Sequence, residues 1–171
     1  MNHVMLDLET MSTAPNAAIV AIGAVCGEET FYLTINLQSC VDYGLHIDAN
    51  TVCWWLQQCA EARKDVATGT YALHHALEVF SSWLSELPEG DTYIWGNGAD
   101  FDNVILANAY KATGLDLPWS HRNNRCFRTL KAMYPNIKHT FDGIAHNALA
   151  DAFNQARHLE AILKVHSGNG I

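Results

Sequence analysis

An apolar run close to the start of the chain ends in two acidic residues, and this segment restricts the fold more than any other. The stretch VMLDLET places Asp7 and Glu9 directly after Val4, Met5 and Leu6. Alternate residues of a β-strand face the same side, so the two carboxylates point the same way. Carboxylates held that close repel each other, and burying a charge without a partner is costly. The segment therefore predicts a buried strand whose end needs compensating positive charge.

Two further acids occur in apolar surroundings later in the chain. Asp102 stands near the start of a helix predicted over 100–114, and Asp151 stands one turn into a helix predicted over 147–166. His146 precedes Asp151 by five residues, which on a regular helix would leave the two side chains about 140° apart. We therefore expect His146 on the loop that enters the helix, from where it can lean toward Asp151.

Each of these residues also has an ordinary interpretation. Asp102 can be an acid that the helix dipole favours, Asp151 can face solvent, and a lone His146 is more often a surface or capping residue than a catalyst. Together with the acid pair on the first strand, they point to one site.

Divalent cations would compensate four carboxylates from three segments, namely Asp7, Glu9, Asp102 and Asp151. Mg²⁺ prefers carboxylate oxygens, and Mn²⁺ is expected to substitute for it. Two ions roughly 3.5–4 Å apart can activate a water and stabilise a leaving oxygen. His146, with an unperturbed pKa of about 6.5, can take the proton from that water.

Hydrophobic periodicity predicts an α/β domain with a mixed sheet. The expected strands cover 3–8, 16–26, 28–37 and 92–96. The expected helices cover 48–63, 70–87, 100–114, 125–135 and 147–166, and 39–47 is expected to be irregular. Gly23, in the second strand, is expected to allow another segment to approach closely.

Composition narrows the class of protein. The chain has 171 residues, a formal net charge of −8 and five cysteines without a CxxC pair, which predicts reduced thiols in a cytoplasmic protein. No apolar run approaches the roughly 18–20 residues of a membrane span, and acids appear too early for a secretory signal. The negative charge argues weakly against a large nucleic-acid groove.

Basic residues nevertheless gather in an acid-free stretch between Leu117 and Phe141. Half of the ten Lys and Arg residues of the chain lie there: Arg122, Arg125, Arg128, Lys131 and Lys138. The first four recur every three residues, so on one helix they would drift slowly around one side. They form either a solvated face or, if the substrate is a polyanion, a phosphate-binding stripe in which Arg125 and Arg128 hold upstream phosphates.

Three motifs resemble those of the DEDDh 3′–5′ exonucleases: DLET, NGADFDNVIL and HNALADA. The stretches DLETMSTAPNAAIVAIGAV, WWLQQ and WGNGADFDN are most similar to the branch of the phage DexA-type exonuclease and RNase AS. The resemblance covers about 4–165. It implies an RNase H-like mixed β-sheet flanked by helices, in a single exonuclease domain over 1–171.

The resemblance also implies roles for individual residues. Asp7, Glu9, Asp102 and Asp151 become ligands of two Mg²⁺ ions, and His146 becomes the general base. The acid of the second motif follows Phe101, so the resemblance selects Asp102. Asp100 is either unrelated to the site or a group that lies just outside the metal ligands.

Further residues are candidates for contact with the substrate. Thr10 and Met11 occupy positions where relatives contact the terminal nucleotide, and Asn97 is expected to shape the loop beside it. Of the adjacent Trp54 and Trp55, one is expected in the core while the other is free to stack a base or to pack against another helix.

The expected function is metal-dependent 3′–5′ hydrolysis of single-stranded DNA, which releases nucleoside 5′-monophosphates. RNA is the alternative substrate, since no residue in the sequence identifies a partner for a 2′-hydroxyl. A catalytically silent nucleic-acid-binding module and a haloacid-dehalogenase-type phosphatase are less favoured, the latter because Glu9 stands where its motif needs Asp. A homodimer is a further expectation from the RNase AS branch alone.

Overall fold

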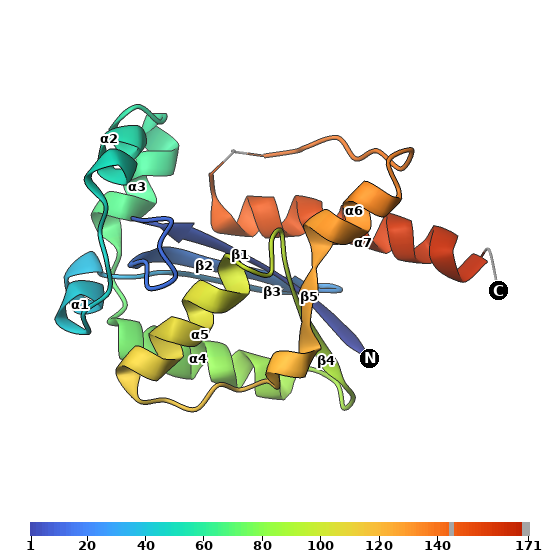
Figure 1. Ribbon diagram of the computed structural model, residues 1–171, viewed down its shortest axis with the longest axis horizontal. Helices are drawn as coiled ribbons and strands as arrows, with labels where there is room; N and C mark the ends of the chain where they lie inside the picture. The colour runs from blue at the N-terminus through green and yellow to red at the C-terminus, as the bar shows by residue number, and fades with distance from the viewer. Residues whose placement is uncertain (144–145, 169–171) are drawn as a thin grey trace.

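A five-stranded mixed sheet forms the centre of the protein in a computed structural model that describes residues 1–143 and 146–168 (Figure 1). Its strands are β1 (Asn2–Thr10), β2 (Ile19–Cys26), β3 (Glu29–Thr34), β4 (Thr92–Gly96) and β5 (Asn124–Cys126). The spatial order is β3-β2-β1-β4-β5. Strands β1 to β3 form an antiparallel meander, whereas β4 and β5 run parallel to β1. The ends of β1 and β4 therefore meet at one edge of the sheet.

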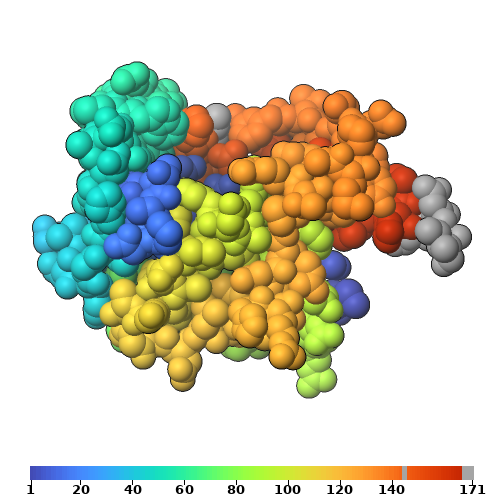
Figure 2. All heavy atoms as spheres, viewed as in Figure 1, coloured from blue at the N-terminus to red at the C-terminus, as the bar shows by residue number. Residues whose placement is uncertain are grey.

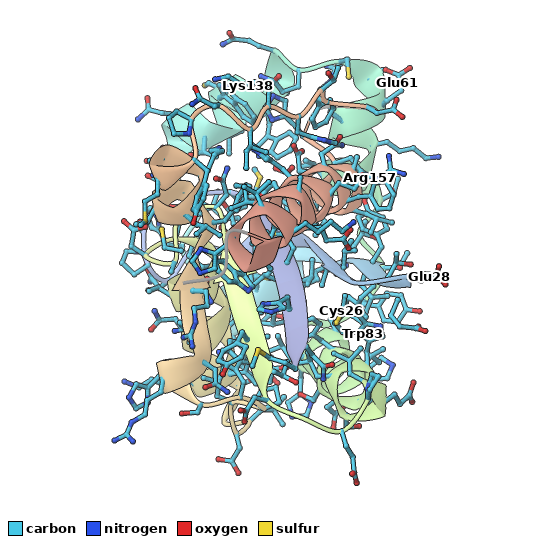
Figure 3. The ribbon with its side chains drawn as sticks, turned by 90° about the vertical axis from the view of Figure 1, so that its right-hand side faces the viewer. Cys26, Glu28, Glu61, Trp83, Lys138 and Arg157 are labelled. Carbon is cyan, nitrogen blue, oxygen red and sulfur yellow. The ribbon has the colours of Figure 1, made fainter. Side chains whose placement is uncertain are left out.

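Helices cover both faces of this sheet. They are α1 (Leu37–Asp42), α2 (Ala49–Leu56), α3 (Ala60–Thr68), α4 (Leu73–Glu86), α5 (Asp102–Thr113), α6 (Phe127–Met133) and α7 (Ala148–Gly168). In Figure 1, α4 and α5 lie below the sheet and α7 lies above it. Figure 3, turned by 90°, shows α7 crossing in front of the strands, with Arg157 on its outer side. The predicted α/β fold with a mixed sheet is confirmed.

The alternation along β1 decides which face receives the acids. Val4, Leu6 and Leu8 belong to the core that packs against α4 and α5. Met5 belongs to the second core, which packs against α7. Because side chains alternate along a strand, Asp7 and Glu9 share the α7 face with Met5.

Gly23 brings the start of α7 close to these acids. It pairs with Asp7 across the β1–β2 ladder. A Cβ atom on Gly23 would lie 2.2 Å from the carbonyl carbon of Ala148, the first residue of α7. Only a residue without a side chain allows this approach, as the sequence predicts.

The single helix predicted over 48–63 is wrong, because the structure has two helices with a break at 57–59. Asp48 caps α2 as expected, and Trp55 anchors α2 by donating from Nε1 to the carbonyl oxygen of Thr10 at 2.9 Å. After the break, α3 packs against β2 and β3, where Asp65 accepts a hydrogen bond from Tyr32. Contacts with the sheet therefore override a helical pattern that runs on through the sequence.

Two other predicted segments need correction. The stretch 39–47 is not wholly irregular, because α1 occupies its first part and Asn36 caps that helix through the backbone N–H of Ser39. The helix predicted over 125–135 starts only at Phe127, because 124–126 form β5 on the edge of β4. Both elements are too short to show a hydrophobic period.

Two properties of the described part of the chain concern its environment. All five cysteines are free thiols. No helix within 1–143 and 146–168 has the length and apolar character needed to cross a membrane.

We predict that Gly23→Ala destabilises the fold strongly. The new methyl group would collide with backbone atoms of α7, which no side-chain rotation relieves. The expected loss in the free energy of unfolding, measured by urea titration, is about 3 kcal/mol or more. Gly27→Ala is the control, since nothing lies within 4 Å of that Cβ position and only the φ of 61° opposes the methyl group. That strain is worth about 1–2 kcal/mol. Equal losses in the two variants would show that α7 can shift without cost.

Candidate active site

The acids singled out in the sequence meet at the carboxyl ends of β1 and β4. Asp7 and Glu9 come from β1, Asp102 is the first residue of α5, and Asp151 lies in the first turn of α7. They line a cavity of about 260 Å³. The other residues around this carboxylate cavity are Leu8, Asn97, Phe101, Arg128, His146 and Gln155. Figure 2 shows the surface hollowed between α2–α3, the start of α5 and the part of the chain around α6 and α7.

Three of the four carboxylates lie within reach of one ion. Asp7, Glu9 and Asp151 each offer an oxygen within 4.8 Å of the other two. Asp102 lies beside them, where its Oδ1 accepts a hydrogen bond of 3.1 Å from the backbone N–H of Leu8. A Cβ atom on Gly96 would lie 3.0 Å from Asp102 Oδ2, so the glycine at the end of β4 makes room for this carboxylate.

Burial raises the pKa of every carboxyl group in the cavity, and repulsion by neighbouring acids adds to the shift for Asp7 and Glu9. The pKa of Asp7 is raised well above its ordinary value by burial and then by the charges of Asp102, Glu9 and Asp151. Burial and the neighbouring acids raise the pKa of Glu9 to about 8. Burial raises the pKa of Asp102 to about 6, although backbone hydrogen bonds oppose the shift. The pKa of Asp151 is also raised, chiefly by burial.

The cavity has the donor set of a divalent-cation site. Among the described residues, no Lys or Arg forms a salt bridge with any of the four acids. Asn97 and Gln155 each have a buried amide oxygen that lacks a hydrogen-bond partner in the same part of the chain. Clustered carboxylates with unpaired amide oxygens suit a hard cation with its bound waters.

His146 stands at the rim of the cavity, two residues before α7. Its φ of 63° is unusual for a residue other than glycine. Its backbone N–H donates to Asp151 Oδ2 at 3.0 Å. Its ring contacts Trp54 of α2 in an edge-to-face arrangement, with 4.9 Å between the ring centroids. The imidazole is therefore held at the cavity from two sides of the molecule.

A second, larger cavity of about 880 Å³ adjoins the first, and Leu8, Glu9 and Phe101 line both. Its other residues come from the end of β1, the loop after it, the segment before α2 and α2 itself: Thr10, Ser12, Thr13, Ala14, His46, Asp48, Asn50, Thr51, Trp54 and Trp55. Trp55 is buried, whereas Trp54 is 41% exposed and presents its ring to this cavity. The volume suits one nucleotide, and the exposed indole offers a stacking surface.

The structure places the five predicted substrate residues in four different locations. Thr10 lines the larger cavity, and Asn97 and Arg128 line the carboxylate cavity. Met11 is buried and lines a different groove between α2 and α3. Arg125 lies outside both cavities, with its guanidinium 4.2 Å from the ring centroid of Tyr93 in β4.

The basic stripe on a single helix is therefore wrong. Arg122 lies in a 3₁₀ helix (His121–Asn123), Arg125 in β5 and Arg128 in α6. Asp100, which the sequence left open, is exposed and lines neither cavity.

The family of the chain follows from comparison with known proteins. A family model described as the 3′–5′ exoribonuclease Rv2179c-like domain matches residues 2–163. The chain belongs to this family. The predicted 3′–5′ exonuclease activity of DEDDh type is thereby confirmed, and exonucleases of this type depend on divalent metal ions. No curated protein matches the chain.

Two solved structures have a similar fold. The nuclease domain of 3′hExo, a DEDDh family member bound to rAMP, superposes with a TM-score of 0.64 at 15% identity, over 98% of this chain and 92% of that one. The cell-death related nuclease 4 (CRN-4) superposes with a TM-score of 0.52 at 17% identity, over 96% of this chain and 64% of that one. The likeness supports the RNase H-like fold predicted from the motifs.

Some residues of the site escaped the sequence analysis of this exonuclease. Gln155 donates from Nε2 to Asp7 Oδ1 at 2.8 Å. It follows Asp151 by four residues, so the helical spacing places both on one face of α7. Ser12, His46 and Asp48 had no such signal, because a loop and a helix start bring them together only in three dimensions.

We predict that stabilisation by divalent cations grows with pH. Between the ordinary pKa of Glu9 at 4.5 and its value of about 8 in the folded protein, folding requires a proton that the unfolded chain releases. The metal-free protein therefore loses stability as pH rises through this window. A cation binds the ionised carboxylates and displaces these protons. The increase in Tm caused by Mg²⁺ or Mn²⁺ should thus be larger at pH 8 than at pH 5.

Two variants give this measurement its controls. Asp151→Asn removes a carboxylate from the cavity and should diminish the increase in Tm. Asp100→Asn removes an exposed acid outside it and should leave the increase as in the wild type. An increase that stays constant from pH 5 to pH 8 would contradict metal binding by these carboxylates.

Proposed function

We propose that the protein is a two-metal 3′–5′ exoribonuclease that removes nucleoside 5′-monophosphates from single-stranded RNA. The observation that carries the proposal is the meeting of four carboxylates beside a nucleotide-sized cavity. The first cavity suits the scissile phosphate and the second suits the terminal nucleoside.

The metal ligands in this proposal are Asp7, Glu9, Asp102 and Asp151, with Mg²⁺ as the physiological ion and Mn²⁺ as a substitute. Asp7, Glu9 and Asp151 offer oxygens within 4.8 Å of one another, and no Lys or Arg forms a salt bridge with any of the four acids in the described chain. Repulsion by neighbouring acids adds to burial in raising the pKa of Asp7 and Glu9. Bound divalent cations supply Lewis acidity that activates a water and stabilises the leaving oxygen.

The side chains around the metals divide the remaining work. His146 accepts the proton of the water as its oxygen forms a bond to phosphorus. The bond from phosphorus to the O3′ atom of the preceding nucleotide breaks, that O3′ gains a proton, and the terminal nucleotide leaves as its 5′-monophosphate. Arg128 lines the same cavity and forms no salt bridge among the described residues, so its guanidinium is available to a phosphate oxygen.

The larger cavity accounts for the removal of one nucleotide at a time. Trp54 offers its ring to the terminal base. Asp48 caps α2 through Oδ1, which leaves its Oδ2 for a sugar hydroxyl, and the Thr10 oxygen, which donates to the carbonyl oxygen of Ser12, can still accept. Stacking is tolerant of base identity because every base has a flat face.

Three observations favour RNA over the DNA expected from the DexA-like stretches. The matched family is described as exoribonuclease, and the solved structure of 3′hExo holds rAMP. The polar groups in the larger cavity also offer partners to a 2′-hydroxyl, the group that distinguishes the two substrates. DNA is the competing substrate in the experiment that follows.

Matched 5′-labelled RNA and DNA oligomers of one sequence test this proposal. With Mg²⁺, the purified protein should shorten the RNA from its 3′ end, release 5′-monophosphates and cleave the DNA more slowly. Asp7→Ala should abolish both activities while the protein stays folded, because the change relieves repulsion among the acids. Faster cleavage of DNA would restore the DNA expectation, and full turnover by Asp7→Ala would overturn the two-metal assignment.

Arg128 and Arg125 give a matched pair for the role of the basic residues. Arg128→Gln should lower kcat/KM about tenfold or more, since a hydrogen bond to a charged group is worth about 1.5–3 kcal/mol. It should also reduce the salt dependence of binding. Arg125→Gln should change neither quantity, because that guanidinium packs on Tyr93 and donates to backbone oxygens of Arg122 and Asn124. Equal effects of the two substitutions would restore the phosphate-binding stripe expected from the sequence.

A further inference from the structure

Three polar side chains from distant parts of the chain meet behind the rim of the active site. Tyr32 of β3 donates its hydroxyl to Asp65 Oδ2 of α3. Asn147, at the entrance to α7, donates from Nδ2 to the Tyr32 hydroxyl at 3.1 Å and to Asp65 Oδ2 at 3.2 Å. All three are half-buried, and we call them the Asn147 clamp. In Figure 1, α3 lies beside the segment that leads into α7.

The clamp uses the whole side-chain amide of Asn147. The carbonyl oxygen caps α7 by accepting from the backbone N–H of Ala150 at 3.0 Å. The amino group faces Tyr32 and Asp65. A helix cap needs only the oxygen, so the amino contacts do something that capping does not require.

The residue next to Asn147 is His146, which the structure holds in a left-handed conformation. Such a conformation in a residue other than glycine persists only where its surroundings enforce it. Three contacts do so here. The clamp fixes Asn147, the Asp151 carboxylate accepts the backbone N–H of His146, and Trp54 contacts the imidazole. Helices α2 and α3 therefore reach this loop at two adjacent residues.

We propose that Tyr32 and Asp65 are positioning residues that hold the general base His146 in place through Asn147. The proposal rests on the function proposed above. Neither residue lines the carboxylate cavity, so neither touches the reacting atoms. Their contribution is the orientation of the imidazole.

The chemistry of the pair suits this task. A carboxylate acceptor gives shorter and stronger hydrogen bonds than a neutral acceptor. Burial and the Asp65 carboxylate raise the pKa of Tyr32 well above its ordinary value, so its hydroxyl stays protonated and remains a donor. The negative charge of Asp65 also contributes to the raised pKa of Glu9. A charge at position 65 therefore makes ionisation of Glu9 less favourable. Support for the cap alone would not call for a charge at this place.

Substitution of Asn147 by Asp separates the clamp from the cap. Asn147→Asp keeps an oxygen for the N–H of Ala150 but places a carboxylate against Asp65. We expect kcat to fall about 10- to 100-fold, the range for a catalytic group displaced by up to about 1 Å, with KM little changed. Asp65→Asn keeps an oxygen acceptor and should lose less. The double variant restores one amide and one carboxylate at the contact, and kcat should recover to within about threefold of the wild type.

A second experiment, in the His146→Ala variant, tests whether the clamp acts through His146. His146→Ala alone should lower kcat about 10²–10⁴-fold. Asn147→Asp added to His146→Ala should cause no further loss, because the clamp then has no base to orient. The double variant that carries Asn147→Asp and Asp65→Asn should bind Mn²⁺ as the wild type does, which calorimetry can measure.

A pair of tyrosine variants separates positioning from stability. Tyr32→Phe removes the clamp hydroxyl, and Tyr110→Phe removes a hydroxyl that bonds Ser81 and the carbonyl oxygen of Leu77. Both should lower Tm, but only Tyr32→Phe should lower kcat. All assays use whichever of the matched RNA and DNA oligomers the wild type cleaves faster.

The outcomes distinguish this proposal from the proposed function. If His146→Ala keeps wild-type kcat, the base assignment fails and the clamp fails with it. If His146→Ala is impaired while Asn147→Asp keeps wild-type kcat, only the clamp is overturned. The clamp is also overturned if kcat of the double variant does not recover. It is overturned as well if Asn147→Asp lowers kcat by the same factor in the His146→Ala variant as in the wild type.

Discussion

Repulsion among four carboxylates at one edge of the sheet is the constraint on which the rest of this structure depends. Asp7 and Glu9 alternate with core residues of β1, so the packing of Leu6 and Leu8 against α4 and α5 forces both acids onto the α7 face. Asp102 and Asp151 then arrive at the starts of two helices. Burial and the neighbouring acids raise the pKa of Asp7 and Glu9, so the ionised carboxylates are unfavourable in the metal-free protein. A cation that binds there removes this cost, which couples metal binding to stability.

Close approach of backbones makes the gathering geometrically feasible. Without a side chain at Gly23, the first turn of α7 lies against β2 beside Asp7. Without one at Gly96, Asp102 lies against the end of β4. The ends of two strands and the starts of two helices thereby come close enough for their carboxylates to share one cavity. The same glycines leave no space for α5 or α7 to slide, since protein interiors lack voids that would absorb such a shift.

Helices α2 and α3 contact the loop that enters α7, and α2 also lines the larger cavity. Trp54 of α2 lines the nucleotide-sized cavity and also contacts the ring of His146. Asp65 of α3 contacts the neighbouring Asn147. The break at 57–59 separates the helix that carries Trp54 from the helix that carries Asp65. This break in the predicted helix therefore lies beside the two cavities.

The sequence by itself determined the acids, the histidine and the face of β1 on which the carboxylates stand, because alternation and helical period are local properties of the chain. It also determined α4, α5 and α7, whose apolar stripes are long and whose ends are marked by residues such as Pro88 and Gly114. Only the tertiary structure decided which arginine side chain lies at the site. Arg125 and Arg128 look equivalent in the sequence, but pairing of β5 with β4 turns Arg125 onto Tyr93 and leaves Arg128 at the carboxylates. The Asn147 clamp joins residues 32, 65 and 147 through single hydrogen bonds, and such bonds impose no period on the residues around them.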